Sequence, residues 1–394
     1  MRVLVTAVGK RTEHWEGFFS ALIAQPNLEL DVLVADVTQL TLRWLEGIER
    51  RHPGRFRFHV ARHLIGEERT GHMASIAYAP GSWRWLQRRP EVIHLIGEPS
   101  YLSTAQTITL RDRRWPGVPI THYAAQNVQI RFPLPFPWLE RRAYRKLNLA
   151  LPITNAALEV LRIKGYQGPA RIVPLGVDRA RFTSTTDPPA GPFTVGFVGR
   201  LEPHKGLADL LAAARGAHLR LLIVGDGSLR GEVEAEAAAR PGQVELVPWS
   251  DHDELPALLS RMHVLALPSI EIVQHHVLPW MRVPLREQFG RVLIEAMSCG
   301  VPCVGTRVGE VAEVIANAGL LVEQNRPDQL QAALARMRDD RELAARLRCS
   351  AIERGSQFGW DHIAAEVCAA WRELTKDKRH ADSLLRAPVL TAAR

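Results

Sequence analysis

The stretch VGFVGRLEPHKGLADLLAAA, residues 195–214, decides the fold class of this chain. It begins as an apolar run of the kind found in buried strands, and this run ends at Gly199. Arg200 and Lys205 follow in a turn, and an amphipathic segment begins near Gly206. A strand, a short polar turn and a helix in this order form the first half of a β-α-β unit, the building block of parallel sheets.

The same alternation of strand-like and helix-like segments continues on both sides of this stretch. In the first half of the chain the predicted strands are Val3–Ala7, Leu30–Val34, Arg55–Val60, Val92–Ile96, Ile120–Tyr123 and Leu149–Ile153. In the second half they are Thr194–Val198, Arg220–Val224, Val244–Val247, Val264–Leu267, Val301–Val304 and Leu320–Val322. The segments between them are long enough for crossover helices. The sequence therefore predicts an α/β protein with two Rossmann-like, doubly wound domains that face a central cleft.

A segment rich in Pro, Gly, Ser and Thr, PLGVDRARFTSTTDPPAGPF at residues 174–193, separates the two halves. It has no helical period and is typical of an interdomain linker. We expect an N-terminal domain at 1–178, a linker at 179–192, a C-terminal domain at 193–357, a last helix at 358–376 and a loose tail at 377–394.

Composition limits the classes of protein to be considered. The 394 residues are too many for one compact core, and 46% hydrophobic with 23% charged residues is typical of soluble globular proteins. No apolar run approaches the roughly 20 residues of a membrane-spanning helix, and the N-terminus lacks a secretory cleavage site, so we expect a cytoplasmic protein. The net charge of +8 favours an anionic partner. Nucleic acid is disfavoured, because acidic residues are mixed through the chain and no aromatic-basic RNA motif occurs.

The turn after the strand that ends at Gly199 carries two cations beside a predicted helix N-terminus. Arg200 can grip two phosphate oxygens and Lys205 adds a mobile point charge, so the turn suits a diphosphate. The alternative is a pair of solvated loop cations, which is how most such residues behave. Gly225 follows the next strand, in the sequence IVGDG, and would let a ligand approach the backbone.

Two carboxylates flank the helix predicted from Gly290. Glu287 lies in the loop before this helix and Glu295 lies one and a half turns inside it. Ionised carboxylates accept hydrogen bonds from sugar or ribose hydroxyls. The alternative for Glu295 is an ordinary surface pair with Arg291, its i,i−4 neighbour.

Taken together and in this order, these motifs resemble one family. They are Gly176-Val177-Asp178 with Phe182, then Gly199-Arg200-Leu201 with Lys205-Gly206, Val224–Gly227, Leu267–Ser269, and Glu287 with Glu295. The order resembles family four of the retaining glycosyltransferases, which have the GT-B fold. The resemblance covers most of the chain and is strongest from Pro174 to Val322.

This resemblance implies roles for the motif residues. Arg200 and Lys205 would hold the diphosphate of a nucleotide-sugar donor, Glu287 would contact the transferred sugar, and Glu295 would hold the ribose hydroxyls. The last helix would cross back to the N-terminal domain. No cofactor is implied, because the nucleotide sugar is a substrate, and members of the fold usually work without a metal.

The N-terminal domain would hold the acceptor. His122, near the end of its predicted strand, matches the position where family members often carry a histidine close to the donor sugar, and His94 is the rival position. A histidine at a strand end is more often structural. Gly9, in the first strand-helix turn, would let the backbone approach the donor phosphates, or serves the tight turn alone.

Three features depart from the family pattern. Gly309-Glu310 stands where two glycines usually precede the acid, and the stretch Ile270–Arg286 is longer than the usual loop before the first glutamate. Trp249 stands where a glycine is common, beside the expected nucleobase pocket. The adjacent pair His275-His276 in the long loop is not a metal motif. These departures bear on donor specificity more than on the reaction.

The implied reaction is transfer of a hexose from a nucleotide-diphosphate sugar to an acceptor hydroxyl, with the anomeric configuration retained. The first expected donor resembles UDP-glucose and the second is GDP-mannose. The acceptor would belong to polysaccharide, glycolipid or small glycoside synthesis. The alternatives are a nucleotide-sugar epimerase of the same fold and a non-catalytic nucleotide-sugar-binding partner subunit.

The segment Arg131–Leu147 mixes aromatic residues with four cations, Arg141, Arg142, Arg145 and Lys146. Such a segment can lie on an anionic membrane, which would make the protein peripheral at the cytoplasmic membrane. The alternative, which we favour, is a core-packed helix that turns Leu139, Ala143, Tyr144 and Leu147 inward.

Overall fold

The computed structural model divides the chain into two compact units. Unit 1 comprises Met1–Pro174 together with the helix that begins at Trp360, and unit 2 comprises Leu175–His275 with Arg282–Gly359. The structure describes residues 1–66, 73–130, 132–184, 187, 189–248, 252–275 and 282–376, without the side chains of residues 11, 13 and 275.

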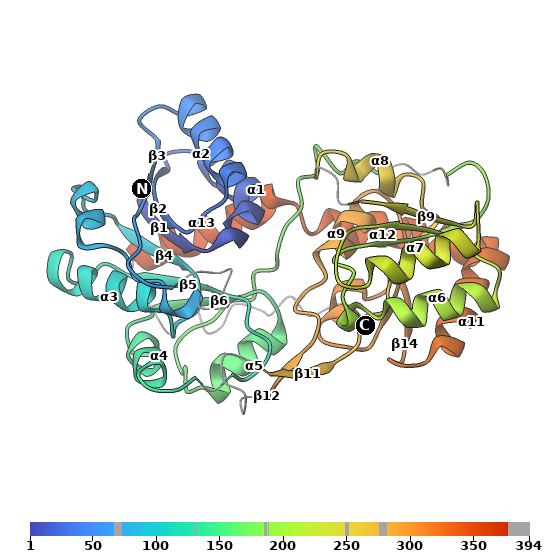
Figure 1. Cartoon of the computed structure of the whole chain (residues 1–394). Coiled ribbons are helices and arrows are strands. Elements are labelled where there is room, and N and C mark those ends of the chain that lie inside the picture. Colours follow the sequence, from blue (N-terminus) through green and yellow to red (C-terminus); the bar gives the residue numbers. More distant parts are fainter. Residues whose placement is uncertain are drawn as a thin grey trace. The chain divides into compact units, whose positions relative to one another are not determined.

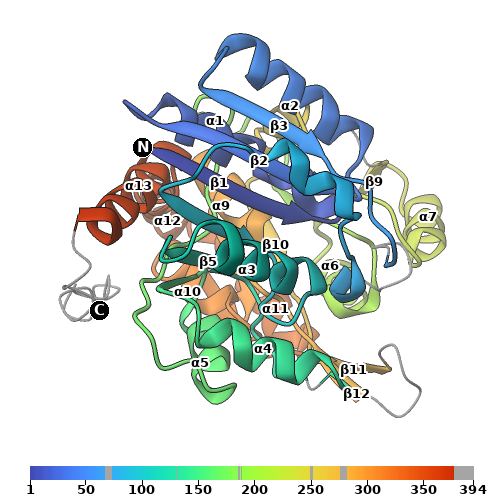
Figure 2. The same cartoon turned by 90° about the vertical axis from the view of Figure 1, so that its left-hand side faces the viewer.

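Unit 1 is built on a six-stranded parallel sheet in the order β3-β2-β1-β4-β5-β6 (Figures 1 and 2). Its strands are β1 Arg2–Val8, β2 Glu29–Ala35, β3 Phe56–Val60, β4 Val92–Ile96, β5 Ile120–Ala124 and β6 Leu149–Pro152. Its α-helices are α1 Glu16–Ala24, α2 Gln39–Arg51, α3 Leu102–Arg114, α4 Phe136–Tyr144, α5 Asn155–Ile163 and α13 Trp360–Lys376. The 3-10 turns are η1 Lys10–Trp15, η3 Met73–Ser75 and η4 Pro80–Trp85.

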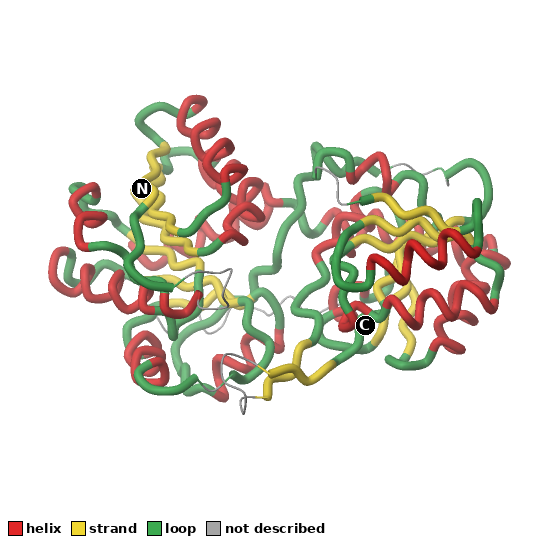
Figure 3. The backbone as a smooth tube through the Cα atoms, viewed as in Figure 1, coloured by secondary structure: helices red, strands yellow, loops and turns green. Residues whose placement is uncertain are grey.

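Unit 2 repeats this plan with the order β14-β13-β10-β7-β8-β9, again parallel (Figure 3). Its strands are β7 Thr194–Val198, β8 Arg220–Val224, β9 Val244–Val247, β10 Val264–Leu267, β13 Cys303–Thr306 and β14 Gly319–Val322. The helices are η5 Pro203–Lys205, α6 Leu207–Gly216, α7 Arg230–Ala239, α8 Leu255–Leu259, α9 Arg291–Ser298, α10 Val311–Ile315, α11 Pro327–Asp339 and α12 Arg341–Ser356.

Both sheets therefore share one topology, in which the first strand lies in the middle and the chain winds outward from it on either side. The strands are nearly continuous runs of buried apolar residues, as expected where helices cover both faces. This confirms the predicted fold class, two Rossmann-like doubly wound α/β domains. No helix among the described residues is long and apolar enough to cross a membrane.

The last helix, α13, packs in unit 1 and contacts α1. Trp371 on α13 is fully buried, and its indole Nε1 donates to Thr121 Oγ1 at 3.1 Å. Trp360 lies against Gly17 of α1, where a Cβ on the glycine would collide with the indole ring. A side chain at position 17 would therefore push α13 away.

Apart from one-residue shifts at strand ends, the structure differs from the sequence predictions at three places. The strand expected at Val301–Val304 begins two residues later, at Cys303. The long stretch 270–286 contains a two-stranded antiparallel hairpin that the sequence did not predict, β11 Ile272–His275 with β12 Arg282–Leu285. The third difference concerns the division between the units.

The chain joins unit 2 at Leu175, earlier than the expected boundary after residue 178. The backbone N–H of Val177 donates to the carbonyl of Phe358 at 2.7 Å, which fixes this segment to unit 2. Phe182, in the predicted linker, is buried, with its ring 5.2 Å from that of His252. The linker is therefore in part a packed segment of unit 2. The predicted tail, 377–394, lies outside the described residues.

Candidate functional site

The turn after β7 brings two cations to the carboxyl end of the unit 2 sheet. Arg200 is exposed directly after the strand, and Lys205 ends the short helix η5. His204 lies between these two cations in the sequence. Burial, followed by the charges of Lys205 and Arg200, lowers the pKa of its imidazole. Gly206 follows at φ 68°, and a Cβ there would collide with the carbonyl oxygen of Pro268. The turn is therefore packed tightly against the loop that follows β10.

Lys205 does not extend into solvent but forms a close ion pair. Its Nζ lies 2.6 Å from Glu287 Oε2, and both side chains are largely buried, at 16% and 10% exposure. Ser269 Oγ donates to the same carboxylate oxygen at 3.0 Å. The carbonyl of Ser269 in turn accepts a hydrogen bond from Thr306 Oγ1. The ends of three neighbouring strands, β7, β10 and β13, thus meet at one carboxylate.

The charge state of Glu287 follows from this surrounding. Burial raises the pKa of its carboxyl, but the charge of Lys205 and hydrogen bonds from Lys205 and Ser269 outweigh that effect, so the pKa lies below its usual value. The backbone of Glu287 is also fixed. Gly309 has φ 56°, and a Cβ there would collide with the Glu287 carbonyl. Glycine at position 309 is needed for this close approach.

Glu295, the second glutamate, is buried within α9, with 4% exposure. Its Oε1 accepts from His252 Nε2 at 2.9 Å and lies 3.3 Å from Arg291 Nε. The i,i+4 pair with Arg291 considered from the sequence therefore exists, but its carboxylate is not on the surface. The His252 ring continues the chain of contacts to Arg181, 3.1 Å away.

Gly225 lies in the turn after β8, where its backbone closely approaches the turn after β7. A Cβ on Gly225 would collide with the carbonyl of Gly199, and one on Gly227 would meet that of Leu201 at 2.6 Å. The backbone N–H of Leu201 also donates to the carbonyl of Asp226 at 2.8 Å. The glycines thus hold the β7 and β8 turns together, which places Gly225 beside the segment that carries Arg200.

The two histidines predicted from unit 1 are both fully buried. His122 Nε2 lies 2.7 Å from the carbonyl of Gly97, and burial lowers the pKa of its ring to about 4. His94 Nδ1 lies 2.8 Å from Thr121 Oγ1, with its ring against Trp371, and burial lowers its pKa to about 3. His94 thus belongs to the packing of α13. His122 is buried and held by its contact with Gly97, and its catalytic role stays a prediction.

Gly9 forms a tight turn at the end of β1. It has φ 90°, its N–H donates to the Ala35 carbonyl at 2.9 Å, and its own carbonyl accepts from Thr12. The structural role considered for Gly9 is therefore present, and the approach to donor phosphates stays a prediction.

The structure thus brings Lys205 and Glu287 into direct contact, with Arg200 and Gly225 in the adjoining turns of the same sheet edge. Glu295 lies in the same unit with its own partners. Sequence reasoning missed His252, since nothing in the sequence marks a histidine 43 positions before Glu295 as its neighbour. Ser269 belongs to the Leu267–Ser269 motif, but its contact with Glu287 could be predicted only with the order of the strands in the sheet.

The described residues contain no group of three or more His, Cys, Asp or Glu side chains placed to hold a metal ion. Trp249 and His276, named as departures from the family pattern, lie outside the described part of the chain.

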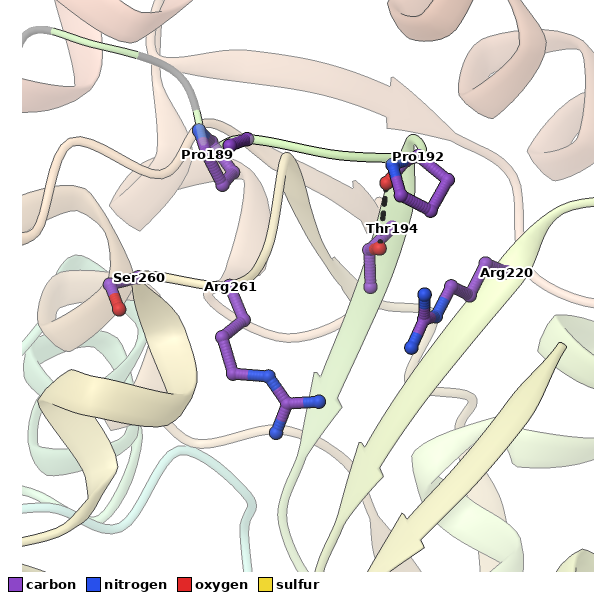
Figure 4. Close-up of a pocket in the computed structure, with 7 residues that line it drawn as sticks. Pro189, Pro192, Thr194, Arg220, Ser260 and Arg261 are labelled. Carbon is purple, nitrogen blue, oxygen red and sulfur yellow. Dashed lines mark hydrogen bonds between the residues drawn. The ribbon is translucent and has the colours of Figure 1, made fainter. Parts of the chain in front are cut away.

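A pocket occurs at the opposite edge of the unit 2 sheet (Figure 4). It is lined by Pro189, Ala190, Pro192, Thr194, Arg220, Ser260 and Arg261. Thr194 and Arg220 are the first residues of β7 and β8, so the pocket is at the amino ends of the strands. Its arginines both contact Glu245, at 3.7 Å from Arg220 and 2.6 Å from Arg261. Their charge is partly neutralised, and we do not assign the donor to this pocket.

Comparison with known proteins relates this part of the chain to a known family. A family model described as glycosyl transferases group 1 matches residues 178–354. Unit 2 is a group 1 glycosyl transferase domain. This domain contains the Lys205–Glu287 pair together with Arg200, Gly225 and Glu295. Gly9, His122 and α13 lie outside the matched range.

A curated relative carries the same kind of domain. The D-inositol 3-phosphate glycosyltransferase of Jonesia denitrificans is 31% identical over 229 residues, which are 51% of this chain and 50% of the relative. The match therefore spans about half the length of that protein.

Solved structures resemble nearly the whole chain. HepE of Anabaena, in complex with UDP, has a TM-score of 0.68 at 15% identity and covers 95% of this chain and 100% of its own. Sucrose-phosphate synthase of Thermosynechococcus elongatus has a TM-score of 0.69 at 20% identity, with coverages of 95% and 99%. At these identities the likeness shows the fold, which is GT-B: two units, each with a Rossmann-like sheet.

Proposed function

We propose that this protein is a retaining glycosyltransferase that moves a hexose from a nucleotide-diphosphate sugar to an acceptor hydroxyl. One observation carries the proposal: the buried Lys205–Glu287 ion pair, with Ser269, at the carboxyl ends of β7, β10 and β13 in a group 1 domain. This edge is where open parallel sheets bind their ligands. A nearby cation and a fixed carboxylate suit a diphosphate and a sugar hydroxyl respectively.

The chemistry of each residue follows from the difficult step, which is departure of the nucleotide diphosphate while positive charge develops on the anomeric carbon. Arg200, Lys205 and the amides at the start of α6 would stabilise the leaving phosphates. Glu287 would orient the sugar and hold Lys205, and Glu295 would bind the ribose hydroxyls. We propose attack by the acceptor on the face that the diphosphate leaves, with a phosphate oxygen helping to take the acceptor proton.

We propose a UDP-glucose-like compound as the first candidate donor and GDP-mannose as the second. Structures similar in fold are described in complex with UDP and with UDP-glucose, which supports the uridine nucleotide. Because Arg200 and Lys205 supply countercharge to the diphosphate, we propose that transfer needs no metal ion. Undiminished turnover in excess EDTA is the expected result.

For the acceptor we propose binding by unit 1, in polysaccharide, glycolipid or small glycoside synthesis. A lipid-linked acceptor is supported by exposed apolar side chains at α4: Trp138 on the helix is 53% exposed, and Leu134, just before it, is 79% exposed. Arg141 and Arg145 are exposed on the same helix or at its end. The inward residues are buried as the core-packed interpretation expects, so α4 has one packed and one open face. Peripheral contact with an anionic membrane on the cytoplasmic side is therefore part of the proposal.

Calorimetric titration with UDP, GDP and ADP tests the donor. One nucleotide should bind, and Lys205→Ala should weaken it, whereas no binding of any nucleotide would contradict the proposal. Incubation with the nucleotide sugar alone then separates the alternatives: slow release of the sugar supports a transferase, an isomerised donor an epimerase, and an unchanged donor a non-catalytic binding subunit. Nuclear magnetic resonance of the product shows whether the anomeric configuration is retained.

A further inference from the structure

A buried polar cluster in unit 1 is not used by the proposed donor site. Glu98 follows β4 and Gln126 follows β5, and these strands are neighbours in the sheet. The backbone N–H groups of Ala125 and Gln126 lie close enough to the Glu98 carboxyl to act on its pKa, which they lower. Two strand-end turns therefore lie close together at the edge where parallel sheets bind ligands.

A buried ion pair supports these two residues from behind. Lys164 Nζ donates to Gln126 Oε1 and to Glu140 Oε1, at 2.8 Å each. The Lys164 and Glu140 side chains are 5% and 13% exposed, whereas Glu98 and Gln126 are half-buried. Glu98 and Gln126 thus keep part of their surface exposed, whereas the Lys164–Glu140 pair is packed.

Two further polar atoms lie in the same strand and turns. Ser100 Oγ and His122 Nδ1 are buried and make no hydrogen bond within the described structure. His122 is tied to this place because its other nitrogen contacts the Gly97 carbonyl. Buried polar atoms without a partner are rare in proteins, and a bound water or ligand is one explanation for them.

We propose that Glu98 and Gln126 form a subsite that binds a hydroxyl group of a neutral, polyhydroxylated acceptor. This rests on the proposed glycosyltransferase function and names its acceptor class. Lys164 and Glu140 are positioning residues for the subsite.

The hydrogen-bonding character of the pair selects a hydroxyl. Lys164 occupies the Gln126 oxygen, which leaves the amide nitrogen as the group that can donate. Glu98 accepts through its carboxylate. A hydroxyl group both donates and accepts, so it satisfies the two residues together.

The charge of the cluster disfavours an anionic acceptor group. It contains two carboxylates, Glu98 and Glu140, for one ammonium, Lys164. Burial, and to a lesser degree Glu140, raises the pKa of Glu98 to about 7, although Lys164 and the two backbone amides act to lower it. A phosphate placed here would meet repulsion and no free cation of the cluster, so phosphorylated acceptors should bind less well than their neutral counterparts.

The test uses UDP-glucose as donor and matched pairs of acceptors: myo-inositol with D-inositol 3-phosphate, and glucose with glucose 6-phosphate. UDP release is measured above the acceptor-free rate for the wild type, Glu98→Ala and Glu98→Gln. Glu159→Gln, an exposed carboxylate on α5, is the matched control for loss of charge. At least one neutral compound should act as acceptor with a lower KM than its phosphate ester.

Glu98→Ala should raise the KM for that neutral acceptor at least about tenfold, because a hydrogen bond to a charged group is lost. The KM for UDP-glucose should change far less, and Glu159→Gln should leave both values unchanged. Glu98→Gln should fall between, since its amide oxygen still accepts. A thermal melt of each variant identifies any that is unfolded, and Glu98→Gln carries the test if Glu98→Ala is.

The subsite would be overturned if only phosphorylated compounds accelerate UDP release, or if no neutral compound does. It would also be overturned if the Glu98 and Glu159 variants have equal KM values for the acceptor. A wild type that binds none of UDP, GDP and ADP and hydrolyses neither UDP-glucose nor GDP-mannose would overturn the proposed function instead.

Discussion

Lys205 and Glu287 lie 2.6 Å apart, and each is largely withdrawn from water. Removing one member of such a pair leaves the other charge buried without compensation, so the two substitutions should not act independently. The pair also links the two proposed roles, because the residue proposed to orient the sugar fixes the residue proposed to bind the diphosphate.

Lys205→Ala should lower kcat/KM at least about tenfold, as expected for a lost charge that stabilises the leaving group. Arg230→Ala is a control in the same unit, since Arg230 is an exposed cation paired with Asp226 and Glu234 on α7. A double-mutant cycle with Glu287→Gln should give a combined loss smaller than the product of the single losses. Fully multiplicative losses, or unchanged kinetics in Lys205→Ala, would contradict the shared role.

The two glutamates should differ in what they bind. Glu295→Gln should weaken binding of free UDP, because the ribose is part of that ligand. Glu287→Gln should impair sugar transfer more than UDP binding. Calorimetry with UDP and kinetics with UDP-glucose separate the two effects, and equal UDP affinity in the wild type and both variants would refute the division.

The raised pKa of Glu98 predicts that the stability of the protein depends on pH. Its pKa is raised from 4.5 to about 7 in the folded state, so the folded protein keeps a proton that the unfolded chain loses over this range. Stability contributed by protonated Glu98 is present below pH 4.5 and is lost as the pH rises through 7. The loss is about 3 kcal/mol at most.

The free energy of unfolding of Glu98→Gln, relative to the wild type, should therefore rise between pH 4.5 and 8. Tryptophan fluorescence during urea unfolding can follow it, since every tryptophan among the described residues belongs to unit 1. Glu159→Gln, at an exposed carboxylate of the same unit, is the matched control for this comparison. A flat curve for Glu98→Gln would show that its carboxyl is ionised in the folded protein at neutral pH.

The residues of the donor site could be found from the sequence because each stands at a fixed offset in a short motif. The buried polar cluster around Lys164 in unit 1 could not be found in this way. Its members stand at positions 98, 126, 140 and 164, in four different segments, and only the order of β4, β5 and β6 brings them together. Likewise, nothing local predicts that the His122 ring contacts the Gly97 carbonyl.

At the scale of elements, the strands were predictable because a strand covered on both faces is one continuous apolar run. Thr194–Val198 and Arg220–Val224 were located to the residue. The β11–β12 hairpin was not, because its strands are not continuous buried apolar runs and Pro284, within β12, argues against a strand. Its arms start shortly after Ser269 and end two residues before Glu287, so it is attached at both ends to the candidate site.

Helix α13 should contribute strongly to the stability of unit 1. Trp371 is fully buried and hydrogen-bonded to Thr121, which also contacts His94. Trp371→Ala should lower the free energy of unfolding by about 4 kcal/mol, through lost burial and the cavity left behind. Trp138→Ala, at an exposed tryptophan of the same unit, should change it by less than about 0.5 kcal/mol. Comparable effects in urea unfolding would show that α13 is not part of the core.

At the scale of the whole molecule, the net charge of +8 suits an anionic partner, but part of the basic character of α4 is compensated internally. Arg142 and Lys146 both lie near Asp112, at 3.7 and 3.5 Å. Within the described part of the chain, Arg141 and Arg145 form no such ion pair. They are exposed beside Leu134 and Trp138, which leaves a mixed apolar and basic surface on the outer side of α4.

If this surface meets a membrane, the protein should sediment with anionic phospholipid vesicles at low salt and be released at high salt. Each surface cation contributes about 1 kcal/mol near an anionic bilayer, and exposed charges are screened over about 10 Å at 0.1 M salt. The double variant Leu134→Ala/Trp138→Ala should weaken sedimentation, because inserted apolar side chains are lost. Leu40→Ala, at an exposed leucine on α2, should not. Leu139→Ala should instead destabilise unit 1, since Leu139 faces the core. A wild type that stays in the supernatant at both salt concentrations would show that the outer side of α4 is only a solvated surface, and the acceptor would then be sought among soluble polyols.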